Sequence, residues 1–371
     1  MFRAKCRAGH GPMEGLLNAV LEPENVGMVT LEEIRSAANR ISSVAVRTGL
    51  ERLQPEKLKT AGIDGLPFAL YIKAENEQPI GSFKLRGGYN RISQLSPEEL
   101  KRGVITYSSG NHAQAVAYSA RALGGKAVIV MPENAPLVKR KATAAMGAEI
   151  VLVGPASSER KAKAEELAAQ HGYTMIPPYD DPAIIAGQGT CGLEILEQLG
   201  PDSVRSALIL SPVSGGGLLS GIATAVKLAA PAGSHVEVWG AEPELAADAK
   251  ESFETKRLVE WPAAKTTRTI CDGLRTQSLG SLNFEHILRY VDGIASVSEE
   301  QIRAAMRVMR EATGLVPEPS GAVSMAAALF RHDALPAAKN VVVVMSGGNI
   351  DPELRRELEQ GTNFALPQHS H

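Results

Sequence analysis

The amino-acid sequence predicts an α/β protein with two open parallel sheets, the smaller one nested within the larger. The first observation is the alternation of short apolar strands with helical segments along almost the whole chain. The second is a run of four β-α units between about residues 103 and 181, because strands joined by helical crossovers pair in parallel. The third is Val341–Val344, a run without polar alternation that indicates a strand buried on both faces.

The composition is that of an ordinary globular protein and argues against several other classes. Of 371 residues, 44% are hydrophobic and 22% are charged, and the formal net charge of −2 gives no sign of a nucleic-acid-binding surface. No apolar run approaches the ~18 residues of a membrane-spanning helix. We therefore expect neither nucleic acid nor membrane as a partner. Cys6, Cys191 and Cys271 lie too far apart for a zinc or disulfide pattern, which favours a cytoplasmic location.

Capping signals and strand-forming runs define the elements of the first half. The segment Thr30–Glu33 is a capping box that opens a helix to about Val46. Ser96 precedes another helix with Pro97 at its first position. The expected strands are Phe68–Lys73, Val104–Tyr107, Ala127–Met131, Glu149–Val153 and Tyr173–Ile176, and helices start near Asn111, Pro136, Ser157 and Ile184.

A second set of strands completes the larger sheet. The expected strands are Ala207–Ser211, His235–Trp239, Ile294–Val297 and Asn340–Met345, with helices over Ser298–Ala312, over Ser320–Phe330 and after Asp351. We expect a large domain of residues 1–102 and 182–371 and a small mobile domain of residues 103–181. Residues 1–28 are expected to form a loosely ordered extension.

The segment Ser214–Leu218, with three consecutive glycines, joins an expected strand to a helix. Consecutive glycines let backbone N–H groups converge on an anion, and the helix N-terminus adds its positive dipole. It is not a Walker loop, because no Lys-Ser or Lys-Thr follows, and its glycine spacing differs from the dinucleotide fingerprint. The segment therefore predicts a phosphate cradle, and the alternative is a flexible connector.

Two further loops also follow expected strands. Ser108–His112 gathers hydroxyls, an amide and free N–H groups, which suits a carboxylate. The alternative is an ordinary helix cap with a surface histidine. Ser346–Asn349 follows the valine strand at the end where ligands bind in open α/β sheets, and the neutral Ser346 could hydrogen-bond a heterocycle nitrogen. The alternative is a turn into the next helix.

One lysine has unusual neighbours. Lys84 follows Phe83 and lies two residues before Arg86, with glycines on both sides of the segment. Partial burial and a nearby cation lower the pKa of an ammonium group and free the amine as a nucleophile. Considered without other information, Lys84 would be read as a solvated surface lysine, since most lysines are.

Together these segments resemble fold-type II pyridoxal-phosphate enzymes, and within them the threonine/serine dehydratase and serine racemase branch. The resemblance spans residues 30 to 355 and rests on four motifs in the family's order, with Glu318–Ala322 as a further landmark. It implies the tryptophan-synthase-β-like architecture, pyridoxal 5'-phosphate as cofactor, a small-molecule amino-acid substrate and a homodimer.

The resemblance also implies a role for each motif. Lys84 would form the Schiff base with the cofactor and remove the substrate's α-proton, and Ser109 would be the acid/base on the opposite face. The cofactor would contact Phe83, Lys84, Asn111, Ser214, Gly215, Gly216, Gly217, Leu218, Glu318 and Ser346. The substrate carboxylate would contact Ser108, Ser109, Gly110, Asn111 and His112.

The function implied is β-elimination from a β-hydroxy amino acid such as L-serine or L-threonine, giving a 2-oxo acid and ammonia. A neutral Ser346 at the ring nitrogen would make the cofactor a weaker electron sink, which suits elimination more than transamination. The alternatives are a serine or aspartate-type racemase, and an ammonia-lyase for 3-hydroxyaspartate or phenylserine. A non-catalytic, two-domain ligand-binding protein is the rival class, against which the presence of Lys84 argues.

A metal site is implied by the same resemblance. Glu242, Ala246 and Asp248 match the spacing of the divalent-cation site of the serine racemase branch, where the middle ligand is a backbone carbonyl. Two carboxylates and a carbonyl suit Mg²⁺ or Ca²⁺. The alternative is a solvated acidic loop.

Overall fold

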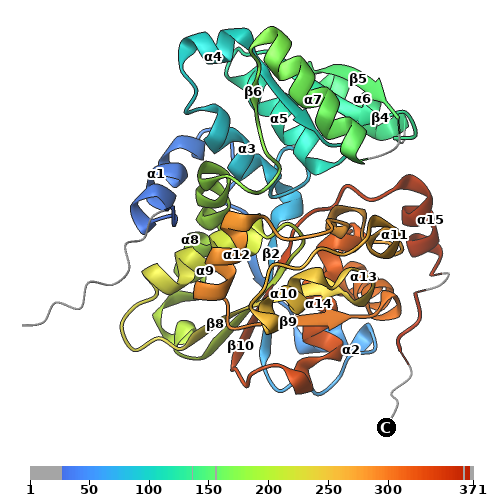
Figure 1. The fold of residues 1–371 in the computed structure, drawn as a ribbon. Coiled ribbons are helices and arrows are strands. Elements are labelled where there is room, and N and C mark those ends of the chain that lie inside the picture. The colour runs from blue at the N-terminus through green and yellow to red at the C-terminus, as the bar shows by residue number, and fades with distance from the viewer. Residues whose placement is uncertain (1–26, 136, 155–156, 362–363, 368–371) are drawn as a thin grey trace, which may run out of the picture.

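The computed structural model describes residues 27–135, 137–154, 157–361 and 364–367. It contains a six-stranded and a four-stranded sheet, with the smaller sheet and its helices in the upper part of Figure 1 and the larger sheet below. Cys6, Pro136 and nearly all of the expected N-terminal extension lie outside the described residues. The prediction of an α/β protein with two parallel-sheet units is confirmed.

The larger sheet has the strand order β1-β2-β10-β7-β8-β9. Its strands are β1 (Leu50–Arg52), β2 (Ala69–Ala74), β7 (Ala207–Pro212), β8 (Val236–Pro243), β9 (Gly293–Val297) and β10 (Asn340–Met345). All neighbours pair in parallel except β1, an unexpected short edge strand that runs antiparallel to β2. The valine strand β10 pairs with β2 on one side and β7 on the other, so its predicted central position is confirmed.

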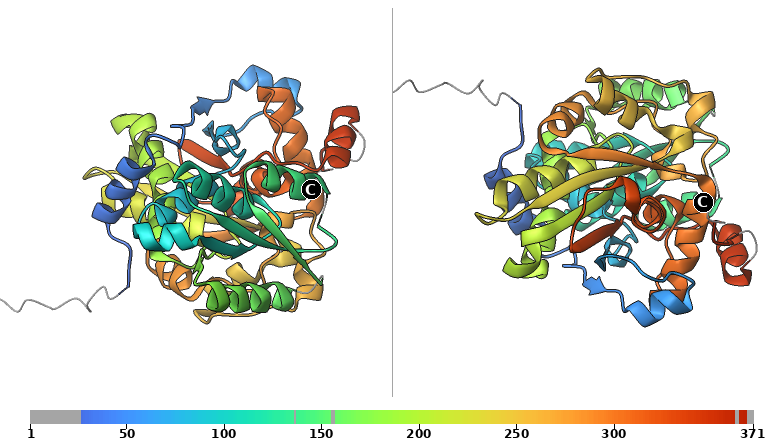
Figure 2. Two further views of the ribbon diagram at one scale, coloured as in Figure 1. Left: turned by 90° about the horizontal axis from the view of Figure 1, so that it is seen from above. Right: turned by 90° about the horizontal axis from the view of Figure 1, so that it is seen from below.

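Helices cover both faces of the larger sheet, as the view from below in Figure 2 shows. They are α1 (Leu31–Ile41), α2 (Pro55–Thr60), α8 (Pro182–Ser203), α9 (Gly217–Ala229), α10 (Asp248–Thr255), α11 (Ala263–Thr266), α12 (Ser281–Tyr290), α13 (Glu299–Thr313), α14 (Pro319–Phe330) and α15 (Pro352–Gln360). Val341 and Val343 of β10 pack with α2, α13 and α14, whereas Val342 and Val344 pack with α8, α9 and α12. This alternation places both faces of Val341–Met345 in a core and explains why this part of the strand carries no polar residue.

The smaller sheet has the order β5-β4-β3-β6 and is parallel throughout. Its strands are β3 (Val104–Tyr107), β4 (Ala127–Pro132), β5 (Glu149–Val153) and β6 (Thr174–Met175), and its helices are α4 (Pro97–Arg102), α5 (Asn111–Ala122), α6 (Leu137–Ala145) and α7 (Ser157–His171). A further helix, α3 (Lys84–Ile92), packs against both α5 and α8 and so connects the two sheet units.

Most expected elements are found, with some corrections. The capping box at Thr30 is present, but the helix ends at Ile41 rather than near Val46, because the N–H and hydroxyl of Ser42 both bond to the carbonyl of Asn39. The strand expected at His235–Trp239 continues to Pro243. Among the described helices, none combines the length and apolar character that crossing a membrane requires.

Candidate active site

Lys84 is the first residue of α3, and its amine contacts a neighbouring backbone segment. Nζ donates a hydrogen bond of 2.6 Å to the carbonyl of Pro178 and lies 5.2 Å from the centre of the Phe83 ring. Burial lowers the pKa of Lys84 from 10.5 to about 8. A much larger fraction of the amine is therefore neutral, and nucleophilic, near pH 8 than in an ordinary lysine.

The segment Ile176–Tyr179, which follows β6, contacts three of the predicted motifs. The carbonyl of Ile176 lies 3.0 Å from Nε2 of His112. Two residues further along, the carbonyl of Pro178 accepts the hydrogen bond from the Lys84 amine. A Cβ built on Gly215 would overlap with the ring of Tyr179. The lysine, the Ser108–His112 loop and the glycine loop therefore meet at the carboxyl end of this strand, where open α/β sheets bind ligands.

The glycine loop connects β7 to the start of α9. Gly216 has φ +98°, a conformation that favours glycine, and no side chain caps the first turn of α9. The N–H groups of this turn are therefore available to an anion. Oγ of Ser214 lies 2.6 Å from Oγ1 of Thr276, and Leu218 anchors the helix start in the core.

The loop at Ser108–His112 borders open space on one side and the core on the other. Ser109 and Gly110 are half-buried, and a Cβ built on Gly110 would meet no atom within 4 Å. Oγ of Ser108 accepts the N–H of Gly110 at 3.3 Å. The alternative of a surface histidine is wrong, because His112 is buried, and burial together with the charge of Lys84 lowers its pKa to about 3.

An amide–carboxyl chain links this loop to the start of α14. Nδ2 of Asn111 donates to Oε1 of Glu318 at 2.7 Å, while Oδ1 of Asn111 accepts from Nδ2 of Asn349 at the same distance. Burial raises the pKa of Glu318 from 4.5 to about 7; the nearby Asp272 adds to this rise, and the bond from Asn111 opposes it. The group therefore titrates near neutrality.

The Ser346 loop runs alongside the lysine segment. The N–H of Phe83 donates to the carbonyl of Ser346 at 3.0 Å, and Ser82 forms a β-bridge with Gly347. Ser346 is buried, with Oγ 3.5 Å from the carbonyl of Ser320 in α14. Two motifs more than 260 residues apart in the sequence are thus held side by side by backbone hydrogen bonds.

The three residues of the expected metal site form a separate group at the end of β8. Glu242 belongs to the strand itself, Ala246 ends the short helix η3 (Glu244–Ala246) and Asp248 begins α10. Both carboxyl groups are buried, so the alternative of a solvated acidic loop is wrong. Burial raises the pKa of Glu242, with a further contribution from Asp248, whose own pKa burial raises to about 7.

Four residues of the site were not singled out by the sequence. Pro178 and Tyr179 follow a predicted strand at the end where ligands bind, which was a usable signal. Asn349 was part of the Ser346 loop but had no assigned role. Thr276 carried no signal, because its contact with Ser214 joins loops 62 residues apart.

The comparison with known proteins agrees with this geometry. Residues 47–347 match the family model described as pyridoxal-phosphate dependent enzyme. The L-threo-3-hydroxyaspartate ammonia-lyase of Saccharomyces cerevisiae is 40% identical, over 87% of this chain and 94% of that protein. The serine racemase of Schizosaccharomyces pombe is 38% identical, over 89% of this chain and 97% of that protein. The crystal structure of a T.th. threonine deaminase superimposes with a TM-score of 0.79 at 42% identity, covering 87% of this chain and 99% of that one.

The chain belongs to the family of pyridoxal-phosphate dependent enzymes. The resemblance drawn from the four motifs is therefore confirmed, and so are the fold type and pyridoxal phosphate as cofactor. The rival class of non-catalytic binding protein is set aside, because these three relatives are an ammonia-lyase, a racemase and a deaminase.

Proposed function

We propose that this enzyme catalyses β-elimination from a β-hydroxy amino acid, releasing a 2-oxo acid and ammonia. The observation that carries the proposal is that the other three motifs lie around the Lys84 segment. Pro178 bonds that amine, Tyr179 covers the glycine loop, and Phe83 is joined to Ser346.

The residues present fit the cofactor. A Cβ on Gly215 would overlap with Tyr179 and one on Gly217 would press against it, so packing favours glycines here, and glycines leave backbone N–H groups bare, as a phosphate requires. When bound, pyridoxal phosphate supplies an aldehyde carbon for an amine and a conjugated ring that accepts electrons. Ser214–Leu218 would hold the phosphate, and Asn111 and Ser346 would hold the ring at its hydroxyl and nitrogen.

Lys84 acts twice in the proposed mechanism. Its Nζ gives the amine that binds the cofactor, and once released it takes the α-proton from the substrate. A pKa of about 8 suits a base that must accept a proton near neutral pH. Ser108–His112 orients the substrate by its carboxylate through hydroxyl and N–H donors, and His112 stays neutral because its pKa is about 3.

The substrate is tested by measuring 2-oxo acid and ammonia from L-serine, L-threonine, L-threo-3-hydroxyaspartate and phenylserine. Lys84→Ala should abolish turnover while leaving the phosphate cradle intact, so that cofactor remains bound without the visible band of the lysine-bound form. Wild-type rates in this variant would refute the assignment of Lys84. The absence of 2-oxo acid from all four substrates would refute the elimination.

Racemisation is the second candidate, and Ser109, a half-buried residue with a hydroxyl in the Ser108–His112 loop, favours it. We propose that Ser109 moves a proton on the face opposite Lys84. Elimination needs only Lys84 and a leaving group, so it should dominate. Ser109→Ala should then remove exchange of the α-hydrogen on the opposite face, yet leave appreciable elimination. L-Serine in heavy water, analysed by chiral chromatography, tests this; D-serine that accumulates faster than pyruvate would make racemisation the main activity.

We also propose that Glu242, Asp248 and the carbonyl of Ala246 bind Mg²⁺ or Ca²⁺. Among the described residues, no group of three or more His, Cys, Asp or Glu side chains is placed to hold a metal. The proposal instead rests on Oε2 of Glu242 and Oδ2 of Asp248, which are buried without a hydrogen-bond partner. Neutralising Asp248 should abolish any melting-temperature gain with Mg²⁺ or Ca²⁺, roughly 2.7 kcal/mol of stability at 100 times Kd. Identical melting of the wild type in excess cation and in chelator would refute the site.

The last part of the proposal concerns domain movement and assembly. Residues 103–181 are proposed to move as a small domain against residues 1–102 and 182–371, and two copies of the chain are proposed to form a homodimer in the cytoplasm. Light scattering at several protein concentrations tests the dimer. A monomeric mass throughout would contradict it.

A further inference from the structure

Four buried charged side chains lie behind Lys84, and the proposed chemistry uses none of them. Arg86 and Lys73 are fully buried, as is Glu75. The fourth, Glu194, keeps only 15% of its side chain exposed. Arg86 follows Lys84 by two residues, about 200° around the helix, so its side chain leaves α3 on the other side.

The four side chains satisfy one another. Arg86 bonds Glu194 at 2.7 and 2.9 Å and Glu75 at 2.7 and 2.8 Å, in each case with two N–H groups. Lys73 reaches Glu194 at 2.6 Å. Burial alone would lower the pKa of Arg86, but the charge and hydrogen bonds of Glu75, with a further contribution from Glu194, outweigh burial and raise it. Two positive and two negative charges therefore form a neutral cluster. Because Arg86 bonds each carboxylate through two parallel hydrogen bonds, the pairs fix the orientation of the side chains as well as balancing their charge.

The pair Arg86–Glu194 joins α3 to α8 where their backbones touch. A Cβ built on Gly187 of α8 would lie 2.6 Å from Cα of Gly87 and 2.7 Å from the carbonyl oxygen of Arg86. Both distances are too short for any side chain. At this point the two helices thus meet backbone to backbone, and the ion pair adds a side-chain connection between them.

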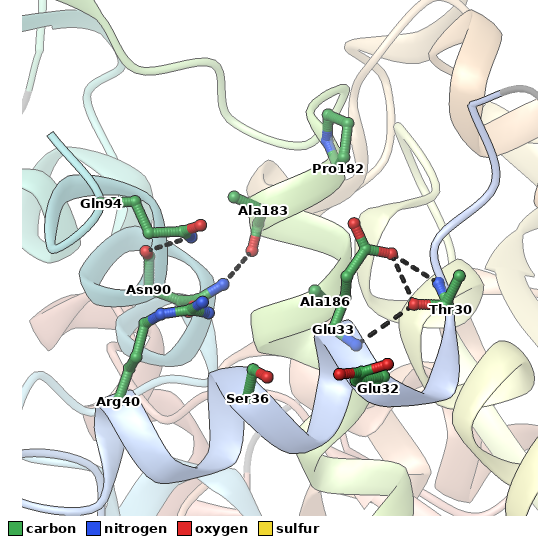
Figure 3. A pocket seen from close by; sticks show the side chains of 10 residues that line it. All are labelled: Thr30, Glu32, Glu33, Ser36, Arg40, Asn90, Gln94, Pro182, Ala183 and Ala186. Atoms are coloured by element: carbon green, nitrogen blue, oxygen red, sulfur yellow. Dashed lines mark hydrogen bonds between the residues drawn. The ribbon is translucent and has the colours of Figure 1, made fainter.

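The same helix α8 also sets the position of the glycine loop. A Cβ on Gly221 of α9 would lie 2.6 Å from the nitrogen of Gly189 of α8, which is again backbone contact. Further along α3, Asn90 donates to the carbonyl of Ala183 in α8 at 2.7 Å, beside a cavity of about 290 Å³ (Figure 3). None of the proposed site residues lines this cavity. Helix α8 is therefore a common frame for α3, which begins with Lys84, and α9, which begins at the phosphate cradle.

We propose that Arg86 and Glu194 are positioning residues, which fix the amine of Lys84 at its working distance from the phosphate cradle. The inference rests on the proposed role of Lys84 and adds the residues that set its position. A misplacement of about 1 Å at a reacting centre costs on the order of 100-fold in rate. Weakening the pair should therefore slow capture of the aldehyde by Lys84 while leaving the cradle intact.

Two probes that differ at one carbon separate these effects. Pyridoxal 5'-phosphate has the aldehyde that Lys84 captures, and pyridoxine 5'-phosphate has an alcohol there and binds only through non-covalent contacts. In the full-length apoenzyme, borohydride reduces the bond between pyridoxal phosphate and Lys84 and so makes its formation measurable. Glu194→Gln should slow this bond formation by about 10- to 100-fold. Its Kd for pyridoxine phosphate should stay within about twofold of wild type. Arg86→Lys, which keeps the charge but loses the fork, should show the same split.

Met306→Ala is the matched stability control. Met306 is fully buried in α13, on the opposite face of the larger sheet from α8 and α9, so its truncation destabilises the fold without touching the frame. It should lower the melting temperature and leave the capture rate unchanged. If Glu194→Gln does not fold, Gly187→Ala gives an independent test, because the added methyl group must move α3 away from α8.

The possible outcomes separate a failure of the proposed function from a failure of the positioning role alone. If wild-type protein traps no cofactor at Lys84, the proposed function itself is wrong. If the wild type traps cofactor and the Glu194 and Arg86 variants do so at the wild-type rate, only the positioning role is wrong. An equal loss of capture and of pyridoxine phosphate binding would also refute it, because that pattern is a general structural defect.

Discussion

Replacing Glu318 by glutamine should make the apoenzyme more stable at pH 8 and leave its stability at pH 4 nearly unchanged. Burial raises the pKa of this carboxyl from 4.5 to about 7, so the folded protein holds its proton more tightly than the unfolded chain does. Stability therefore falls as the pH rises from about 4.5 through 7, because the proton must be given up in a buried setting. Glutamine resembles the protonated form and escapes this loss.

The magnitude follows from the two pKa values. The difference between 4.5 and about 7 corresponds to roughly 3 kcal/mol at pH 8, which we take as an upper bound. At a few °C per kcal/mol, the variant should melt about 5 °C higher than wild type at pH 8. Thermal melts of both proteins from pH 4 to 8 measure this. Asp248 titrates in the same range but is common to both proteins, so it cancels in the difference. A melting difference that stays constant across the pH range would refute the reasoning.

Three further predictions concern the residues around the amine. Capture of pyridoxal phosphate by Lys84 should reach half its maximal rate near pH 8, because the amine is protonated below that pH. The capture rate of free Nα-acetyl-lysine, measured at each pH, corrects for changes in the aldehyde itself. A corrected midpoint near pH 10.5 would contradict the lowered pKa of the amine. Gly215→Ala should weaken pyridoxine phosphate binding by about tenfold or more, because the new Cβ overlaps with Tyr179, whereas Gly49→Ala, whose Cβ has ordinary contacts, should have no effect. The rate-against-pH curve should show no inflection near 6.5 from His112, whose pKa is about 3, and His112→Asn should shift the level of the curve without changing its shape.

The loops of the site could be predicted because strand ends and glycine runs are local signals. Val341–Val344 identifies a buried strand by composition alone, and the polar loop that follows must then lie at the carboxyl edge of the sheet. The same reasoning located Ser108–His112 and Ser214–Leu218. How these loops face one another depends on contacts such as Asn111 to Asn349, which join positions 238 residues apart. No local pattern contains that information.

Helix α3 was missed for a physical reason. Gly87 and Gly88 lower the helix propensity of the segment, so the sequence does not indicate a helix there. The structure needs both glycines, because a Cβ on Gly87 would collide with Gln188 and one on Gly88 would press on Ala115. Tertiary packing thus selects residues that oppose the local preference. The buried position of Glu242 was missed similarly, since nothing local distinguishes a carboxylate in a strand from one in a loop.

The segment between β6 and α8 limits how the two sheet units can move apart. Ile176 is bonded to β3 of the smaller sheet, and Asp181 caps α8 through bonds to Ala183 and Ile184. The five Cα–Cα steps from Ile176 to Asp181 span at most about 18 Å when fully extended. Separation of the sheets at this edge is therefore limited by the length of this tether. Pro178 lies within this tether, so its hydrogen bond with the Lys84 amine belongs to the part of the molecule that such a movement would displace least. In the proposed movement of the small domain, the far edge of the smaller sheet would travel furthest and the nitrogen of Lys84 least.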